Sequence, residues 1–331
     1  MKRKAFLNTM VVVSCLLWVM GGLGAEAAQF KAEKPEIKVA VSLSSSTFLP
    51  IYLALDQGFY KEEGLSVELV TFRGGSALLK GVVGGSVDIG VSGLASLSLG
   101  VKAKQDLKVF YAGINPSGFY WYSVDRIKSL ADAKGATFGV SRYGSTTDFL
   151  TRYVLKARGL DPQQDVKIVQ GGGSASRAAA MEKGQIDVNI YAAPDNFMAA
   201  EKGYRQLLAL SEVVPEYPMQ SLYATGDFIR KNPNTIKAFL RAHVKAVRLA
   251  KKDKALSVKT LVKHVRLEEK YAALGYDDFI NNLYEDGRWP DEKSMNAFWE
   301  IGIMAGTYKE KWPVEKYFDS TFTDSYSEWK P

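Results

Sequence analysis

The stretch GGSALLKGVVGGSVDIGVSG (74–93) has a counterpart roughly 99 residues later, GGSASRAAAMEKGQIDVNIYA (172–192). Each stretch holds a GGS turn, then a segment with helical spacing, then an apolar segment typical of a strand. Two copies of one design within a single chain indicate two structural units of similar fold.

The similarity continues upstream of both GGS turns. The first copy begins with IKVAVSLSSS (37–46) and the second with ATFGVSRYGSTT (136–147), and Ser42 precedes Ser141 by 99 residues. The shared order of strand, helix, strand, GGS, helix and strand describes two βαβαβ units. Each unit should have a mostly parallel sheet flanked by helices. The period is too long for a solenoid and predicts an α/β protein with two lobes that face each other.

The segments between and after the copies indicate how the lobes are joined. KVFYAGINPSGFYWYSVD (108–125) is apolar and aromatic with a turn signal, and MQSLYATGDFIRKNP (219–233) is an extended segment followed by a helix start. We expect the chain to cross near 123 and to return near 225, which makes a two-strand hinge. Lobe one then comprises 36–122 and 226–331, and lobe two comprises 123–225. The mainly helical closing segment should pack on lobe one.

The N-terminus has the layout of a secretory signal peptide. A basic start is followed by an apolar stretch and by the small-residue site Ala25-Glu26-Ala27. We expect residues 1–27 to be cleaved and the protein to reside in the periplasm. One alternative is an uncleaved membrane anchor, since the apolar stretch is nearly long enough to span a bilayer. Another is lipidation at Cys15, which an apolar run continuing past that residue disfavours.

Composition excludes several classes of function. Cys15 is the only cysteine, so a mature chain has no thiol nucleophile, no CxxC pair and no Cys-ligated zinc. Loss of residues 1–27 lowers the net charge from +7 to +5, a surplus that favours anionic partners without resembling a nucleic-acid footprint. We expect no cofactor, no metal and no nucleic acid.

Motifs for catalysis are also absent from the sequence. It contains no HExxH, no GxSxG and no P-loop. The two histidines, His243 and His264, lie in the helical last third, where a structural role is the simplest interpretation. Asp88 and Asp187 recur in the repeat, each opening a strand at the end away from the expected cleft, and we interpret them as structural.

Side chains with hydroxyl groups gather at the turns that should face the cleft. In open α/β sheets, ligands sit beyond the carboxyl ends of the strands, and helix N-termini there attract anions. The candidate ligand-binding residues at these turns and strand ends are Ser44, Ser45, Ser46, Thr47, Ser76, Ser92, Tyr143, Ser145, Thr146 and Tyr191, with Thr147 and Ser174 beside them. A plain N-cap is the alternative role for any single Ser or Thr.

Three further candidates lie at the turns and at the first crossing. Arg142 stands beside a helix start, where a guanidinium could clamp a carboxylate or sulfonate in bidentate fashion. A solvated surface arginine is the alternative. Asn115 and Tyr120 lie at or near the expected hinge and could line the binding site of an organic ligand. Packing at the hinge is their alternative role.

The stretch VAVSLSSSTFLPIYLALDQGFYKEEGLSVELVTFRGGSALLKGVVGGSVDIGVSG (39–93) resembles the first lobe of the periplasmic solute-binding proteins of ABC transporters. IKSLADAKGATFGVSRYGSTTDFL (127–150) resembles their entry into lobe two, and IRKNPNTIKAFLRAHVKAV (229–247) resembles their return helix. The most similar class binds sulfonates, taurine, nitrate or thiamine precursors and is called NMT1/THI5-like or SsuA-like. The resemblance covers nearly all of residues 36–325.

This resemblance implies a two-lobed fold of the type II periplasmic-binding-protein class. It also implies a monomeric receptor that captures a small organic anion, a sulfonate or a carboxylate that can be aromatic, by hinge closure and then docks on a membrane permease. The alternatives are a thiamine-pyrimidine ligand, an enzyme, or a sensor on the same fold. Enzymes that resemble this fold depend on cysteine, which argues against a catalytic role here.

Overall fold

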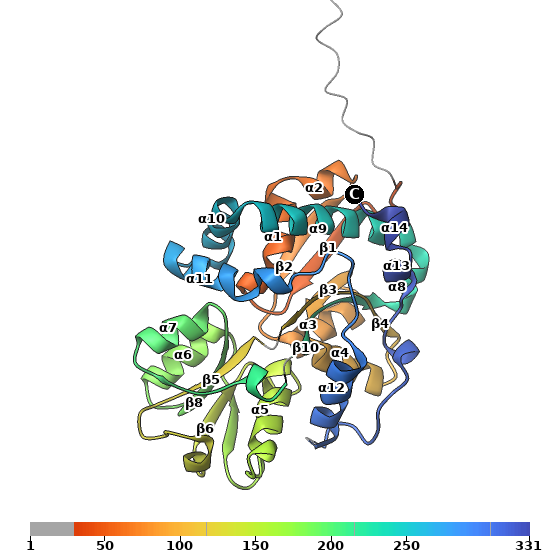
Figure 1. The fold of residues 1–331 in the computed structure, drawn as a ribbon. Coiled ribbons are helices and arrows are strands. Elements are labelled where there is room, and N and C mark those ends of the chain that lie inside the picture. The colour runs from red at the N-terminus through yellow and green to blue at the C-terminus, as the bar shows by residue number, and fades with distance from the viewer. Residues whose placement is uncertain (1–29, 117, 215, 305) are drawn as a thin grey trace, which may run out of the picture.

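The computed structural model describes residues 30–116, 118–214, 216–304 and 306–331. The expected signal peptide (1–27) and Cys15 lie outside the described residues. The chain forms two lobes, each built on one five-stranded sheet with helices around it (Figure 1). The strand orders are β2-β1-β3-β10-β4 and β7-β6-β8-β5-β9, so the two sheets share one topology.

In the sheet of lobe one, four strands run in the same direction and one strand, β10, runs against them. Strand β1 pairs in parallel with β2 and β3, and β10 pairs in antiparallel fashion with β3 and β4. The strands are β1 (Glu36–Val41), β2 (Ser66–Thr71), β3 (Ile89–Ser92), β4 (Leu107–Pro116) and β10 (Glu216–Thr225). The helices within this half are η1 (Ser46–Phe48), α1 (Leu49–Asp56), α2 (Phe59–Glu62), α3 (Gly75–Val83) and α4 (Leu94–Lys102).

Lobe two repeats this arrangement. Strand β6 pairs in parallel with β7 and β8, and β5 lies antiparallel to β8 and β9. The strands are β5 (Phe119–Ser123), β6 (Thr137–Val140), β7 (Lys167–Gln170), β8 (Val188–Ala192) and β9 (Arg205–Ala209). The helices are η2 (Leu130–Ala133), α5 (Thr146–Ala157), α6 (Ser174–Glu182), α7 (Asp195–Glu201) and η3 (Leu210–Glu212).

The repeated aspartates have the same structural role in both lobes. Oδ2 of Asp88 accepts a hydrogen bond of 2.9 Å from the backbone N–H of Lys38, and Oδ2 of Asp187 accepts one of 2.9 Å from that of Thr137. Each aspartate thus ties the start of its lobe's third strand to the first strand. Both side chains lie at the strand starts, away from the carboxyl ends where ligands bind.

The chain crosses between the lobes earlier than the expected positions 123 and 225. Every residue of β5 pairs with β8 in the second sheet, so the first crossing falls between 116 and 119. Strand β10 pairs with β4 from Glu216 onward, so the return falls between 209 and 216. The aromatic run at β5 explains the shift, because Phe119 and Trp121 are buried and pack in lobe two.

The closing segment covers lobe one but also reaches lobe two. Helix α9 packs along α1, whereas α12 contacts both β10 and α5. The Phe298 ring of α12 lies 5.6 Å from the Phe149 ring of α5. Most of the closing segment packs on lobe one, and α12 adds a contact with lobe two that the sequence did not indicate. Its elements are α8 (Gly226–Lys231), α9 (Pro233–Lys252), α10 (Lys254–Val265), α11 (Glu269–Phe279), η4 (Ile280–Asn282), α12 (Glu292–Met304), η5 (Val314–Lys316), α13 (Thr321–Asp324) and α14 (Tyr326–Trp329).

Within the part of the chain that the structure describes, no helix combines the length and the apolar character needed to cross a bilayer.

Candidate functional site

Two adjoining cavities lie between the lobes. The larger, about 470 Å³ and here called the large compartment, is lined by the turns after β1 and β2 on one side and by the start of α6 and the end of β8 on the other. The smaller, about 40 Å³ and here called the small compartment, shares Ser45, Gly74, Phe119, Ser141 and Thr147 with it. Together they form one cleft beyond the carboxyl ends of the parallel strands of both lobes.

Four helices begin at this cleft without a side-chain cap. The N-cap residues of α3, α4, α5 and α6 are Gly74, Gly93, Ser145 and Gly173, and none of their side chains bonds to the first turn. All four residues line one of the compartments. The first N–H groups of a helix carry a partial positive charge and need acceptors. The cleft therefore presents donors from both lobes to an anion.

Two of these N-cap positions depend on glycine. Gly74 has φ +108°, a conformation that side-chain-bearing residues rarely adopt, and a Cβ there would lie 3.1 Å from Oγ of Ser141 in the other lobe. A Cβ on Gly93 would lie 2.5 Å from Oγ1 of Thr146. The absence of side chains at these two positions allows the helix starts of the two lobes to approach closely.

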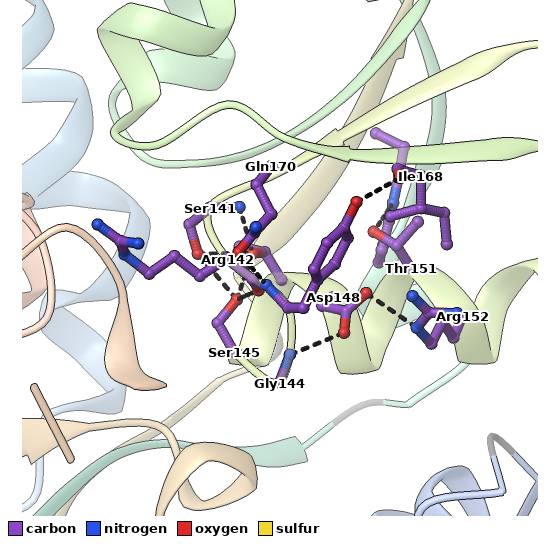
Figure 2. Close-up of polar contacts among 12 residues, drawn as sticks. Ser141, Arg142, Gly144, Ser145, Asp148, Thr151, Arg152, Ile168 and Gln170 are labelled. Carbon is purple, nitrogen blue, oxygen red and sulfur yellow. Dashed lines mark hydrogen bonds and ion pairs between the residues drawn. The ribbon is translucent and has the colours of Figure 1, made fainter. Parts of the chain in front are cut away.

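Three hydroxyl groups form a cluster at the start of α5 (Figure 2). Oγ of Ser141 lies 2.8 Å from Oγ of Ser145 and 2.9 Å from Oγ1 of Thr147, and the last two atoms are 2.9 Å apart. Ser145 also donates to the carbonyl of Arg142 at 2.7 Å. All three hydroxyl-bearing residues are buried and line the small compartment.

The facing turn of lobe one is held in place from several directions. Oγ of Ser45 donates to the carbonyl of Ala193 in lobe two at 3.2 Å and accepts a bond from the backbone N–H of Thr47. The buried side chain of Gln220 donates through Nε2 to the carbonyl of Thr47 at 2.8 Å. This turn is therefore ordered before any ligand arrives.

The large compartment is mainly apolar and carries a surplus of positive charge. Its described charged lining residues are Arg73, Arg177, Lys202 and Arg266, with Asp195 as the one acid among them. Buried Arg177 donates to Oδ1 of Asn189 and to the carbonyls of Gly172 and Ile190. Burial lowers the pKa of Arg177 to about 10, which leaves it protonated near neutral pH, and burial raises the pKa of Asp195.

Part of the sequence-predicted set lies at the cleft. Ser44, Ser45, Tyr191 and Ser174 line the large compartment, and Ser45, Thr47, Ser145, Thr146 and Thr147 line the small one. Side chains with hydroxyl groups from both lobes therefore line this cleft, and they belong to the predicted turns and strand end.

Other predicted residues line neither compartment. Ser46 packs toward α11, and Ser92 is buried at the end of β3. Ser76 lies on the second position of α3, and Tyr143 turns its hydroxyl to the carbonyl of Ile168. Tyr120 donates to Oδ1 of Asp278 at 2.9 Å, a contact between lobe two and α11. The side chain of Asn115 lies outside the described residues.

Arg142 has a different partner from the one expected. Its Nε donates to the carbonyl of Arg73 at 2.9 Å, and its side chain extends away from the hydroxyl cluster (Figure 2). This bond joins the two lobes at the rim of the cleft. The assignment of Arg142 as a clamp for an anion stays a prediction.

Sequence reasoning missed several lining residues that the repeat could have indicated. Ser42 and Ser141 are equivalent positions of the repeat, and both line the small compartment. Arg177 follows the second GGS turn, within an alanine-rich helix where an arginine would normally face solvent. Arg73, Asp195 and Arg266 belong to turns and helix ends whose direction toward the cleft only the fold determines.

Comparisons with known proteins agree with this architecture. The chain is 28% identical over 222 residues to the taurine-binding periplasmic protein of Escherichia coli (strain K12), covering 66% of this chain and 67% of that protein. A solved protein of Bordetella bronchiseptica RB50 is similar with a TM-score of 0.76 and 26% identity, covering 90% of this chain and 98% of the other. The alkanesulfonate-binding protein SsuA from Xanthomonas axonopodis pv. citri, bound to MOPS, shares the fold with a TM-score of 0.74 at 17% identity, covering 88% and 100%.

The NMT1/THI5 like family model matches residues 45–255, which is more than half of the chain and includes most of the turns that line the cleft. The match spans most of both lobes. It includes the helix N-termini and the hydroxyl groups that face the cleft. On this match the chain belongs to the NMT1/THI5-like family.

Proposed function

We propose that this protein is the extracytoplasmic receptor of an ABC importer and that it captures a small organic anion in the cleft between its lobes. The observation that carries the proposal is the set of four helix starts without side-chain caps that face the cleft from both lobes. The names of the relatives, which bind taurine or alkanesulfonates, support the same class of ligand. A periplasmic location and a permease partner follow from this proposal.

The acidic head group of the ligand would occupy the small compartment. Backbone N–H groups at the starts of α3 and α5 would donate to it, and the hydroxyls of Ser141 and Thr147 would turn from each other toward it. Because the donors come from both lobes, the ligand binds the closed form more tightly than the open form. This difference in affinity is what drives closure of the hinge.

In this proposal, contacts across the cleft would hold the closed form together. Oγ of Ser45 bonds to the carbonyl of Ala193, and Tyr120 bonds to Asp278. Nζ of Lys270 in α11 lies 3.0 Å from Oε2 of Glu201 in α7. These bonds would break on opening, and the exposed ion pair of Lys270 and Glu201 contributes little to the stability of the closed form.

A receptor fits the charged residues better than an enzyme does. Two of the proteins compared above are binding proteins by name. Asp88 and Asp187 bond to backbone groups at the strand ends away from the cleft.

Thermal unfolding of the purified protein against a ligand panel tests the proposal. The panel holds alkyl and aryl sulfonates, carboxylates, nitrate and thiamine pyrimidines. A ligand at ~100 times its dissociation constant should stabilise the fold by about 2.7 kcal/mol. Stabilisation by organic anions supports the proposal. Stabilisation by pyrimidines alone would change the proposed ligand from an organic anion to a pyrimidine. If no compound stabilised the ligand-free protein, the proposed function would be overturned.

A further inference from the structure

We propose that the ligand carries two acidic groups separated by an apolar body. One acidic group fills the small compartment, the apolar body lies in the large compartment, and the second acidic group meets Arg73 and Arg266 at the rim. This inference rests on the proposed receptor function and narrows its substrate class.

Arg73 and Arg266 carry the first part of the argument. Both line the large compartment, and among the described residues neither side chain has an ion pair or a hydrogen bond. They flank one turn of lobe one. The N–H of Gly74 donates to the carbonyl of Ser42 at 2.7 Å, and Oγ of Ser44 donates to the carbonyl of His264 at 3.4 Å. Both arginines thus belong to the same wall of the cleft.

The remaining charges of the large compartment offset one another. Nζ of Lys202 pairs with Oε1 of Glu182. Arg177 and Asp195 interact electrostatically within lobe two. The surplus positive charge of the compartment therefore comes from Arg73 and Arg266. Arg142, bonded through Nε to the carbonyl of Arg73, adds a third guanidinium at the same rim.

The size and lining of the large compartment indicate the body of the ligand. Its volume of about 470 Å³ falls within the range of roughly 300–1,000 Å³ typical of pockets for drug-sized organic ligands. An inorganic anion such as nitrate would use the small compartment and leave this space unfilled. Its larger apolar lining side chains include Leu43, Phe72, Phe119, Tyr191, Met198 and Tyr204. A planar or aliphatic apolar body matches this lining.

The backbone at Arg266 provides a way to test the proposal. Arg266 caps the C-terminus of α10 with φ 60°, ψ 50°, a left-handed conformation that glycine adopts at lower energy than arginine. Among the described residues, Lys104 is the one other non-glycine with a positive φ, and it lines neither compartment. Lys104 therefore serves as a matched control for Arg266.

Titration calorimetry with matched pairs of ligands tests the proposal. The pairs are terephthalate with benzoate and adipate with hexanoate. Nitrate serves as a control anion that has no apolar part. We expect each two-acid compound to bind about tenfold or more tightly than its one-acid partner. Equal affinities within both pairs would overturn the two-acid inference while the receptor function stands. Failure of every anion to bind would overturn both.

Two glycine variants distinguish the effect of a lost positive charge on ligand preference from the effect of a relaxed backbone on stability. We expect Arg266→Gly to melt at the same or a higher temperature than wild type, because glycine relieves the left-handed strain, and to lose most of the preference for the two-acid ligand. Lys104→Gly should gain similarly in melting temperature and keep the preference. Arg73→Gln should also reduce the preference. A full two-acid preference in Arg266→Gly and Arg73→Gln would contradict the assignment.

Discussion

At the residue scale, the hydroxyl groups of the small compartment can redirect their hydrogen bonds without any movement of their oxygen atoms. Ser145 donates its proton to the carbonyl of Arg142, whereas in the contact between Ser141 and Thr147 either hydroxyl group can be the donor. When an anion arrives, the last two hydroxyls need only rotate about their C–O bonds. The cluster is therefore preorganised for an acceptor, which lowers the entropic cost of binding.

His243 gives a prediction about pH. It is fully buried in α9, and neither ring nitrogen has a partner among the described residues. Burial lowers the pKa of His243 from 6.5 to about 3. Between these values the unfolded chain binds a proton that the folded chain does not. The free energy of unfolding should therefore fall as the pH falls, by up to about 1.4 kcal/mol per pH unit.

Urea unfolding at pH values on both sides of 6.5 measures this effect. His243→Phe keeps an aromatic ring between Tyr111 and Phe239 but cannot bind a proton. We expect its stability to fall less steeply than that of wild type as the pH drops below 6.5. Parallel curves for the two proteins would show that His243 does not titrate on unfolding.

Single residues also mark the limit of what the sequence could predict. Hydroxyls near strand ends were predictable, because the repeat aligns Ser42 with Ser141 and both reach the small compartment. Side-chain direction was not predictable. Arg142 and Ser145 are three positions apart in one turn, yet Arg142 extends toward Arg73 while Ser145 faces the compartment. The tertiary approach of the second lobe decides between these directions, and local spacing carries no record of it.

At the element scale, the repeat predicted the shared topology of the sheets because equivalent strands begin with equivalent residues. The sequence placed the crossings between the lobes too far along the chain. An apolar and aromatic strand such as β5 could belong to the sheet of either lobe, and only its pairing with β8 decides between them. The two-lobe contact of α12 was missed for a similar reason. Its buried Phe298 and Trp299 indicate a packed helix without indicating which surface covers them.

Helix α12 provides a prediction at this scale. Phe298 is 0% exposed and contacts Phe149 of lobe two as well as Tyr217 of β10. Phe298→Ala should lower the free energy of unfolding by roughly 3–5 kcal/mol through the cavity that it leaves. Ile303→Ala, at a position 41% exposed on the same helix, should change it by less than about 0.5 kcal/mol. Chemical denaturation of both variants compares them, and similar losses would contradict this account of α12.

At the scale of the whole molecule, closure requires that the two lobes fit at the helix starts. Gly93 of lobe one faces Thr146 of lobe two, and its φ of −66° and ψ of 148° suit any residue. Gly93→Ala should therefore fold normally but hinder closure, because the new Cβ would lie 2.5 Å from Oγ1 of Thr146. We expect weaker ligand binding with little change in the melting temperature of the ligand-free protein.

Small-angle scattering with and without ligand would follow closure in this variant. Wild type should become more compact when ligand binds, and Gly93→Ala should contract less. The double variant Gly93→Ala, Thr146→Ala removes the clashing hydroxyl and should recover part of the contraction. Full contraction and unchanged affinity in the single variant would show that the lobes tolerate the added methyl group.

The position of α12 also has a consequence for the rate of ligand exchange. The buried aromatic rings of Phe149, Phe298 and Tyr308 belong to one core cluster that continues from lobe one into lobe two. A wide rotation of the lobes would expose part of this cluster to water, which is unfavourable in proportion to the apolar area uncovered. The most open conformations are therefore sparsely populated, and ligands enter and leave mainly through small, frequent movements of the hinge. Uptake by such a receptor is limited by how often its lobes part, as well as by how often ligand molecules collide with it.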